Sequence, residues 1–394
     1  MRIIYCLSED LNRTSGGSVH FLAVARAMRR LGHQVLIMCP QFHRTMRRFP
    51  PLRSLAIPLP GRNRFSVVLY RLLAAMTIPF VWAAYRPEAL LVRGGGGLSF
   101  PIFWMARLLG IRVVVEVNGI AWEEMRVRKD LRVGFGIIKL LAKIECRSAS
   151  RVIAVTPQIK DELVRTCGLR PEKVFVVQNG ADPEEFGAGD RLRIRRALGL
   201  GPDEFVVGFI GQFTAWHGTL TLAEAAGLVP EELRSRLRIV MVGNGKLWHQ
   251  TRAACDRCGD LVLFPGHASR QDVKDYLAAI DVGISINTNR TIAQYGFSPL
   301  KFWEYLAAGL PVIVQDNCNL TPIVEKWDMG LVVRDIGPRT VADAICRAYR
   351  ERDRMAEVGK RNRQLVRDRF SWTHIAERVV DVLAGTADAD WPGY

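Results

Sequence analysis

A segment in the last third of the chain holds a lysine and a glutamate at a spacing that suits a phosphorylated ribose. Lys301 and Glu304 are three residues apart, so on a helix they share one face. A cation and the free N–H groups of a first helical turn attract phosphate, and a carboxylate one turn later can accept ribose hydroxyls. The alternative is an intrahelical pair on a solvated face, worth only about 0.2 to 0.5 kcal/mol. The apolar neighbours of the pair favour a cleft.

The sequence also predicts where that helix begins and ends. Ser298 is a preferred N-cap residue, and Pro299 suits the first helical position. Gly309 suits the position just past the end, and Pro311 prevents continuation. We therefore expect a helix over about 299–308. Its candidate ligand contacts are Ser298, Pro299, Leu300, Lys301 and Glu304.

Two glycine-containing turns follow predicted strands in the same half of the chain. The segment Phe209–Gly218 leaves a strand and enters a helix, a geometry that presents N–H groups to phosphate. His217 within it could carry a charge or donate hydrogen bonds. The segment Val242–Gly245 repeats the pattern after the next strand, so that a nucleotide could lie against backbone. The candidate residues are Gln212, His217, Gly243, Asn244 and Gly245.

A third glycine turn lies near the N-terminus. Gly16 and Gly17 follow the first predicted strand, and Ser18 is the expected cap of the helix that follows. His20 lies one turn inside that helix. Because structural turn glycines are common, the pair is a weak indicator of a phosphate site without other evidence.

Polar residues also follow two further strands, at the edge where open α/β sheets bind ligands. One strand ends at Arg93 and the run Gly94–Gly97, and the next delivers Glu116 and Asn118. A buried arginine partner for Glu116 and a turn role for Asn118 explain these residues equally well. We interpret the following pair, Glu123–Glu124, as part of a solvated helix face.

Short β-branched runs alternate with helical periods along the whole chain, which predicts an α/β fold with parallel sheets. A glycine- and charge-rich stretch after Asn179 marks a domain junction. We expect an N-terminal domain over residues 1–183, a C-terminal domain over 184–369, and a last helix in 370–394 that could cross back to the N-terminal domain. The predicted strands cover 3–7, 34–39, 89–93, 112–117, 152–156, 174–178, 205–210, 238–242, 261–264, 282–286, 311–315 and 330–333.

The net charge of +16 is concentrated in one part of the sequence. From Leu11 to Pro87 there are twelve arginines and no Asp or Glu. Such a segment creates a positive electrostatic potential. Nucleic acid, anionic lipid headgroups and a lipid-phosphate acceptor would each be attracted to it. A general preference for arginine explains why lysines are few, but it does not explain the missing acids. We therefore expect an anionic partner for the N-terminal domain.

Composition places the chain among globular proteins, because 49% of its residues are apolar and 24% charged. The segment Phe65–Tyr85 is apolar, but Arg71 and Pro79 interrupt it, so we expect a core or interfacial helix. No signal-peptide pattern precedes it, and the scattered cysteines suit a reducing cytosol. Cys255 and Cys258 lack further ligands at zinc spacing, so we expect no metal.

Several of these segments, taken in order, resemble the family-four retaining glycosyltransferases. The resemblance rests on Gly16–His20, Asn179–Asp182 and Val242–Gly245, and on Glu304 with Ala308–Ile313. It implies a GT-B fold, in which two doubly wound Rossmann-like domains face a central cleft. It also implies a nucleotide-sugar donor in the C-terminal domain, with Glu304 holding the ribose, and an acceptor near His20, Arg93, Glu116 and Asn118.

The sequence departs from the family pattern at four positions. The first glutamate of the family signature would fall at Gly296, and Tyr295 or Ser298 is the candidate substitute. The phosphate-binding arginine and lysine correspond to Gln212 and His217, and the acceptor-side histidine corresponds to Asn118. The resemblance therefore implies catalysis by Lys301, His217 and Asn118, with no cofactor, no metal and no carboxylate nucleophile.

The function implied by the resemblance is transfer of a sugar from UDP or GDP to a glycan or lipid-linked acceptor, in cell-surface polysaccharide or glycoconjugate synthesis. The basic N-terminal face adds an anionic membrane surface as a partner, so we expect a cytoplasmic protein, peripheral on the inner face of the plasma membrane. Two alternatives remain: a catalytically silent relative, and a basic nucleic-acid-binding protein. We expect no nucleic acid, because no binding motif accompanies the arginines.

Overall fold

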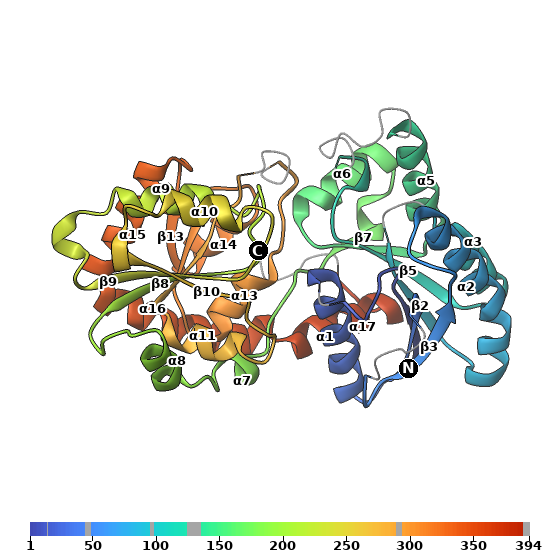
Figure 1. Cartoon of the computed structure of the whole chain (residues 1–394). Coiled ribbons are helices and arrows are strands. Elements are labelled where there is room, and N and C mark those ends of the chain that lie inside the picture. The colour runs from blue at the N-terminus through green and yellow to red at the C-terminus, as the bar shows by residue number, and fades with distance from the viewer. Residues whose placement is uncertain (14, 44–48, 95–97, 124–134, 289–293, 389–394) are drawn as a thin grey trace. The chain divides into compact units, whose positions relative to one another are not determined.

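The structure is a computed structural model that describes residues 1–13, 15–43, 49–94, 98–123, 135–288 and 294–388. The chain forms two compact units, which we describe separately (Figure 1). Unit 1 contains Met1–Asn179, the short segment Tyr295–Phe297, and the C-terminal stretch that begins at Trp372. Unit 2 contains Gly180–Gln294 and Ser298–Ser371.

Unit 1 is built on a seven-stranded parallel sheet with the order β3-β2-β1-β4-β5-β6-β7. The strands are β1 (Arg2–Cys6), β2 (Gln34–Gln41), β3 (Arg53–Pro58), β4 (Ala89–Gly94), β5 (Arg112–Val117), β6 (Arg151–Ala154) and β7 (Val174–Val176). Ile3 in the centre pairs with Val35 on one side and Ala89 on the other. The strands of this sheet are near-continuous apolar runs, because helices cover both faces of a parallel sheet and bury the side chains on each.

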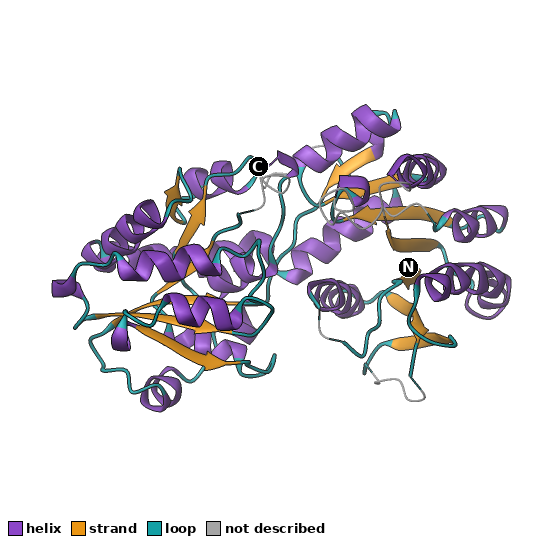
Figure 2. Ribbon diagram, turned by 45° about the horizontal axis from the view of Figure 1, so that its top comes forward, coloured by secondary structure: helices purple, strands orange, loops and turns teal. Residues whose placement is uncertain are grey.

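The helices of unit 1 form two layers (Figures 1 and 2). They are α1 (Gly16–Arg30), α2 (Arg64–Tyr85), α3 (Phe100–Leu108), α5 (Phe135–Ser148), α6 (Pro157–Cys167), the 3-10 turn η1 (Pro171–Lys173) and α17 (Trp372–Ala384). Helix α17 contacts α1 and the central strands, whereas α2, α3, α5 and α6 contact one another in sequence. Alternate residues of β1 face the two layers: Ile4 joins the core beneath α2 and α3, and Tyr5 contacts Phe21 of α1.

The C-terminal helix α17 belongs to unit 1 because arginines from two strands bind its end. Arg112 donates to the carbonyl of Leu383, and Arg151 donates to the carbonyls of Val382 at 3.2 Å and Gly385 at 3.1 Å. The last carbonyls of a helix have no partner inside the helix, and cations are stabilising there.

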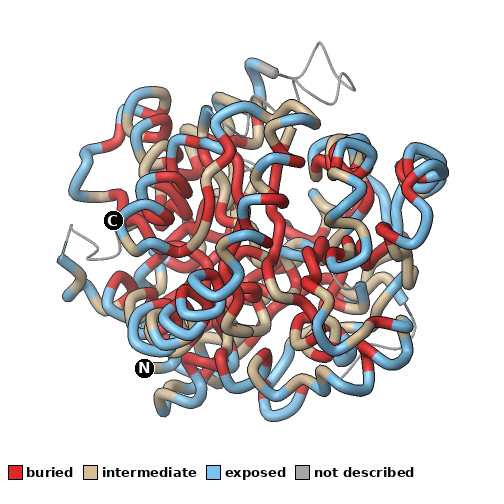
Figure 3. The backbone as a smooth tube through the Cα atoms, turned by 90° about the vertical axis from the view of Figure 1, so that its left-hand side faces the viewer, coloured by how far each residue is buried: buried red, intermediate tan, exposed pale blue. Residues whose placement is uncertain are grey.

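Unit 2 has a six-stranded parallel sheet with the order β10-β9-β8-β11-β12-β13. Its strands are β8 (Phe205–Ile210), β9 (Leu237–Val242), β10 (Val262–Gly266), β11 (Val282–Ser285), β12 (Val312–Gln315) and β13 (Gly330–Val333). Buried residues gather along the strands and on the inward sides of the helices (Figure 3). The two parallel sheets confirm the predicted fold class.

The helices of unit 2 also form two groups by contact. Helix α9 contacts α10 and α15, whereas α11 contacts α7 and α8, and α13 contacts α7 and α16. They are α7 (Pro183–Phe186), α8 (Arg191–Ala197), α9 (Thr219–Gly227), η2 (Glu231–Leu233), α10 (Trp248–Ala254), η3 (Gly259–Leu261), α11 (Val273–Ala279), α13 (Leu300–Ala307), α14 (Leu320–Lys326), α15 (Pro338–Arg350), α16 (Arg352–Leu365) and the π-helix η4 (Val366–Phe370).

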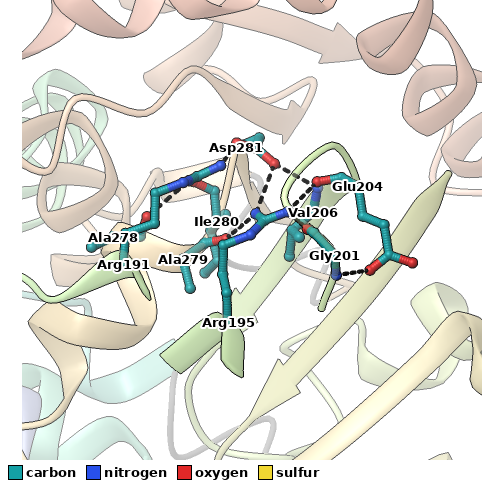
Figure 4. Close-up of polar contacts among 9 residues, drawn as sticks. All are labelled: Arg191, Arg195, Gly201, Glu204, Val206, Ala278, Ala279, Ile280 and Asp281. Atoms are coloured by element: carbon teal, nitrogen blue, oxygen red, sulfur yellow. Dashed lines mark hydrogen bonds and ion pairs between the residues drawn. The ribbon is translucent and has the colours of Figure 1, made fainter. Parts of the chain in front are cut away.

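An ion cluster holds α8 against the first strands of unit 2 (Figure 4). Arg191 donates to Asp281 at 2.8 Å, and the guanidinium of Arg195 lies 3.6 Å from the same carboxylate. Asp281 also accepts the backbone N–H of Val206 at 2.8 Å. Arg195 is only 4% exposed, and burial and the charge of Arg191 lower its pKa. The negative charge of Asp281 therefore stabilises a buried cation.

We expect Asp281→Asn to lower the free energy of unfolding by about 2 to 4 kcal/mol, because it removes the carboxylate that forms an ion pair with the buried Arg195. Asparagine can still accept the N–H of Val206, so the change isolates the charge. The matched control is Arg334→Gln, which breaks exposed pairs worth at most about 1 kcal/mol. Urea unfolding followed by circular dichroism measures both, and equal effects would contradict this role.

Candidate functional site

Helix α13 presents the lysine and glutamate of the predicted site. It covers Leu300–Ala307 with Pro299 as its N-cap, one residue later than predicted. The prediction that Ser298 caps it is wrong, because the hydroxyl of Ser298 accepts the indole N–H of Trp303 at 3.0 Å. A buried indole N–H needs such a partner. Gly309 follows the helix with φ +82°, as its predicted role requires.

Lys301 is a half-buried residue whose ammonium nitrogen is buried and has no hydrogen-bond partner in the part of the chain that the structure describes. Its Nζ lies 4.3 Å from the centre of the Phe209 ring and 3.6 Å from where a Cβ on Gly211 would be. Burial lowers the pKa of Lys301 to about 7, and the charge of Glu304 opposes that change only in part. An unpaired buried ammonium is costly, so the lysine is poised to accept an anion.

Glu304 already has an ion-pair partner, an arginine that no sequence motif marks. Arg270, in the loop after β10, forms an ion pair with Glu304, and its guanidinium also lies 3.6 Å from Glu185. The same guanidinium stacks 4.9 Å from the centre of the Phe186 ring. Burial alone would lower the pKa of Arg270, but the two carboxylates raise it. No local pattern marks Arg270, because its partners are far away in sequence.

The two glycine-containing loops of unit 2 pack backbone against backbone. The N–H of Gly211 donates to Val242 at 3.0 Å, and that of Phe213 donates to Asn244 at 3.0 Å. A Cβ on Gly243 would lie 1.8 Å from the carbonyl oxygen of Gly211. Gly243 and Gly245 also have φ of +135° and +156°. These glycines therefore have a packing role that would exist without any nucleotide.

His217 is neutral in this arrangement. Its Nδ1 lies 2.6 Å from the carbonyl oxygen of Gln212, which can only accept, so Nδ1 carries the proton and Nε2 is left as an acceptor. Burial and the charge of Lys301 lower the pKa of His217 to about 4. Of the two roles considered for His217, a cation is therefore disfavoured. Lys301 is left to supply the positive charge of this loop.

The position where the family signature has its first glutamate is conformationally restricted. Gly296 has φ +69°, a value that disfavours residues with a side chain. The neighbouring Tyr295 packs on the core of unit 1, and its carbonyl accepts the hydroxyl of Thr156 at 2.8 Å. Tyr295 and Ser298 are thus both engaged in packing or hydrogen bonds.

Unit 1 brings together the four residues expected on its acceptor side. The carboxylate of Glu116, 2% exposed, accepts from Arg93 at 3.1 Å and from Asn118 at 2.7 Å. The Nε2 of His20 lies 2.7 Å from the same carboxylate. The hydroxyl of Tyr5, a residue the sequence analysis did not select, donates to Glu116 at 2.7 Å. The predicted set is therefore one buried polar network centred on Glu116.

The network keeps its carboxylate ionised. Burial would raise the pKa of Glu116, but His20 and Arg93, with the hydrogen bonds from His20 and Asn118, lower it well below its ordinary value. The second ring nitrogen of His20 lies 2.6 Å from Oδ1 of Asn179. Both nitrogens of His20 are thus engaged, and the ring is held in one orientation.

The first glycine turn differs from its prediction. The cap of α1 is Ser15, whose hydroxyl accepts the N–H of Ser18 at 3.0 Å, so the prediction of Ser18 as the cap is wrong. The cause is reciprocal bonding, since the hydroxyl of Ser18 accepts the N–H of Ser15 at 2.9 Å. Gly16 and Gly17 are the first helical residues, and a Cβ on Gly17 would lie 2.4 Å from the Glu9 carboxylate. A carboxylate therefore already occupies this helix terminus.

The remaining sequence candidates are accounted for as follows. Gly95–Gly97 and Glu124 lie outside the described residues, and Glu123 is half-buried. In the described ranges, no group of three or more His, Cys, Asp or Glu residues is arranged to hold a metal ion.

Comparisons with known proteins identify the family. Residues 14–185 match the family model described as Glycosyltransferase Family 4, and residues 204–351 match Glycosyl transferases group 1. A D-inositol 3-phosphate glycosyltransferase of Nocardia farcinica is 25% identical over 93% of this chain and 84% of its own length. The enzyme of the same name from Stackebrandtia nassauensis is 31% identical over 56% of this chain and 49% of its own length.

Solved structures agree on the fold. Sucrose-phosphate synthase from Thermosynechococcus elongatus superposes with a TM-score of 0.77 at 18% identity, over 98% of each chain. HepE of Anabaena, solved with UDP and glucose, gives 0.71 at 17% identity over 98% of this chain and 100% of its own. WaaG, a glycosyltransferase of lipopolysaccharide biosynthesis, gives 0.71 at 15% identity, over 97% of this chain and 100% of its own. The chain belongs to glycosyltransferase family 4, the retaining glycosyltransferases of GT-B fold that use nucleotide sugars.

Proposed function

We propose that this enzyme transfers a sugar from a UDP-sugar to a glycan or lipid-linked acceptor in the synthesis of a cell-surface polysaccharide or glycoconjugate. The observation that carries the donor assignment is the ammonium of Lys301, which is buried without a hydrogen-bond partner among the described residues, one helical turn before Glu304. A nucleoside diphosphate supplies the anion that Lys301 lacks and the ribose hydroxyls that Glu304 can accept.

Uracil is the proposed base because HepE, which shares the fold, has been solved with UDP and with UDP-glucose. The acceptor class rests on a weaker analogy, the role of WaaG in lipopolysaccharide biosynthesis. The arginine-rich sequence of unit 1 supports an acceptor that carries phosphate, because such a field attracts anions.

Departure of the nucleoside diphosphate is the step that the residues of unit 2 can assist. As the bond between sugar and phosphate breaks, negative charge grows on the phosphate oxygen. Lys301 and the N-terminal end of α13 would stabilise that charge, as preorganised groups do in other active sites. Neutral His217 can accept a hydrogen bond at Nε2. The departing phosphate oxygen can take the proton of the acceptor hydroxyl, so no protein base is required.

In unit 1, Glu116 acts as a positioning residue. Its carboxylate is saturated by Tyr5, Arg93, Asn118 and His20, so it holds their side chains in place instead of meeting the acceptor itself. Arg93 and Asn118 are the members of this network proposed to touch the acceptor.

A catalytically silent relative is the second candidate, favoured by one observation. The family's first signature glutamate is replaced by Gly296, whose positive φ disfavours a side chain there. Release of UDP from UDP-sugars, measured with and without candidate acceptors, separates the two. A protein that binds UDP but never releases it from any UDP-sugar would be the silent relative.

We expect UDP, but neither GDP nor ADP, to raise the melting temperature, because a ligand that binds only the folded state stabilises it. Glu304→Gln should weaken UDP binding about tenfold or more, since a hydrogen bond to a charged group is worth about 1.5 to 3 kcal/mol. Scanning fluorimetry and calorimetry measure these effects.

The matched control for this experiment is Glu325→Gln, an exposed glutamate of the same unit that pairs with Arg334. It should bind UDP like the unaltered protein. A shift with GDP alone would contradict the proposed base, and the absence of a shift with any nucleotide would contradict the donor site.

For unit 1 we expect Glu116→Gln to lower the rate of sugar transfer about 10- to 100-fold while UDP still stabilises the protein as before. The loss follows because the amide cannot compensate Arg93 and His20, so both lose their fixed orientation. Glu88→Gln, an exposed pair with Arg2, is the control. Initial rates with a UDP-sugar measure the effect, and an unchanged rate would remove the network from the mechanism.

A further inference from the structure

Unit 1 exposes many large apolar side chains on three neighbouring helices, and the reaction does not use them. Nine of the twelve exposed large hydrophobic residues in the described chain lie on α2, α3 and α5. They are Phe65, Val68, Leu72, Met76, Phe80, Trp104, Leu108, Ile137 and Leu140, and we call them the α2–α3–α5 surface. Soluble proteins rarely expose contiguous apolar patches of this kind without a partner.

The five residues from α2 form a single stripe. Their spacing of three and then four residues places them on one side of the helix. Phe65, Met76 and Phe80 are 68%, 66% and 76% exposed. Helix α2 contacts α3, and α3 contacts α5, so the three helices are neighbours in unit 1 (Figure 1). Trp104 and Leu108 are exposed on α3, and Ile137 and Leu140 are exposed on α5.

The opposite side of α2 belongs to the core of unit 1. Ala74 and Ile78 are fully buried, and the hydroxyl of Tyr70 donates to the carbonyl of Met38 at 3.0 Å. Arg71 is buried beside them and donates to Ser8 at 3.3 Å. Although Phe65–Tyr85 is long and apolar enough to cross a membrane, spanning would extract this face from the core. Helix α2 is therefore suited to lie on a surface with its stripe outward.

The exposed charged residues within α2, α3 and α5 are all basic. Helices α2 and α3 contain no acidic residue, and the one acid of α5, Glu145, is fully buried. Basic residues that are exposed lie beside the patch, at Arg62, Arg86, Arg107 and Arg147. A protein partner usually meets a rim of mixed polarity, whereas a bilayer offers hydrocarbon beneath a sheet of anionic headgroups.

We propose that the α2–α3–α5 surface docks on an anionic lipid bilayer, with its apolar side chains in the headgroup boundary and the arginines against lipid phosphates. Apolar area and basic residues together give the two signals that stable peripheral binding needs. Trp104 suits the interface because an indole is amphipathic. This surface would hold unit 1 where a lipid-linked acceptor lies, but docking itself does not depend on the proposed reaction.

The test is co-sedimentation of the full chain with phosphatidylglycerol–phosphatidylcholine vesicles and with phosphatidylcholine alone. We expect binding to the anionic vesicles only. The double variant Leu72→Ser and Met76→Ser should reduce that binding about tenfold or more, because the stripe loses its inserted groups. Leu192→Ser with Leu228→Ser removes equally exposed leucines from unit 2 and should leave binding unchanged.

A second pair of changes tests the charge. Arg62→Gln with Arg107→Gln should weaken binding about fivefold for each residue at low salt, and little at high salt, where surface charges are screened. Unchanged melting temperatures show that the variants fold. The proposal is overturned if the unaltered protein does not bind anionic vesicles. It is equally overturned if the Leu72→Ser and Met76→Ser double variant binds them as well as the unaltered protein does. It is also overturned if sedimentation velocity shows a dimer that this variant dissociates, which would make the surface a self-association site.

Discussion

The proposed donor site in unit 2 depends on one unfavourable arrangement. The Lys301 ammonium is buried without a hydrogen-bond partner among the described residues. Its Nζ rests against the Phe209 ring, and burial lowers its pKa to about 7. An uncompensated cation lowers stability in the free protein, and an incoming diphosphate removes that deficit. The free protein is thus less stable than it could be, and this lost stability is recovered when the anion binds. Active sites often show such an opposition between stability and function.

The surrounding structure keeps Lys301 in that position. The hydroxyl of Tyr305 accepts the N–H of Ile210 at 2.9 Å and so fixes α13 to the end of β8. Glycines at 211, 243 and 245 let two loops pack backbone to backbone, and Gly211 lies beside the lysine. Arg270 holds Glu304, one turn further along the helix. The Lys301 ammonium itself lies beside the Phe209 ring and the backbone at Gly211.

Strong local patterns predicted most of the fold, and long-range pairing explains what they missed. All twelve expected strands overlap strands in the structure, whereas β3 (Arg53–Pro58) was not predicted, because an edge strand with charged and polar residues lacks a clear apolar run. Ser18 and Ser298 were misassigned as caps because each hydroxyl has a partner that propensity cannot foresee. Arg270 and Tyr5 escaped notice because tertiary contacts alone connect them to the glutamates they bind.

The titration of Lys301 is the sharpest test of its role as a buried cation that binds the donor diphosphate. With lysines labelled at Cε, the NMR signal lost in Lys301→Met identifies the residue. We expect it to titrate near pH 7 in the free protein and, with UDP bound, at a clearly higher pH, because the diphosphate favours the charged form. A titration midpoint near the ordinary pKa of lysine in the free protein would contradict this role of Lys301. So would a midpoint that UDP does not move.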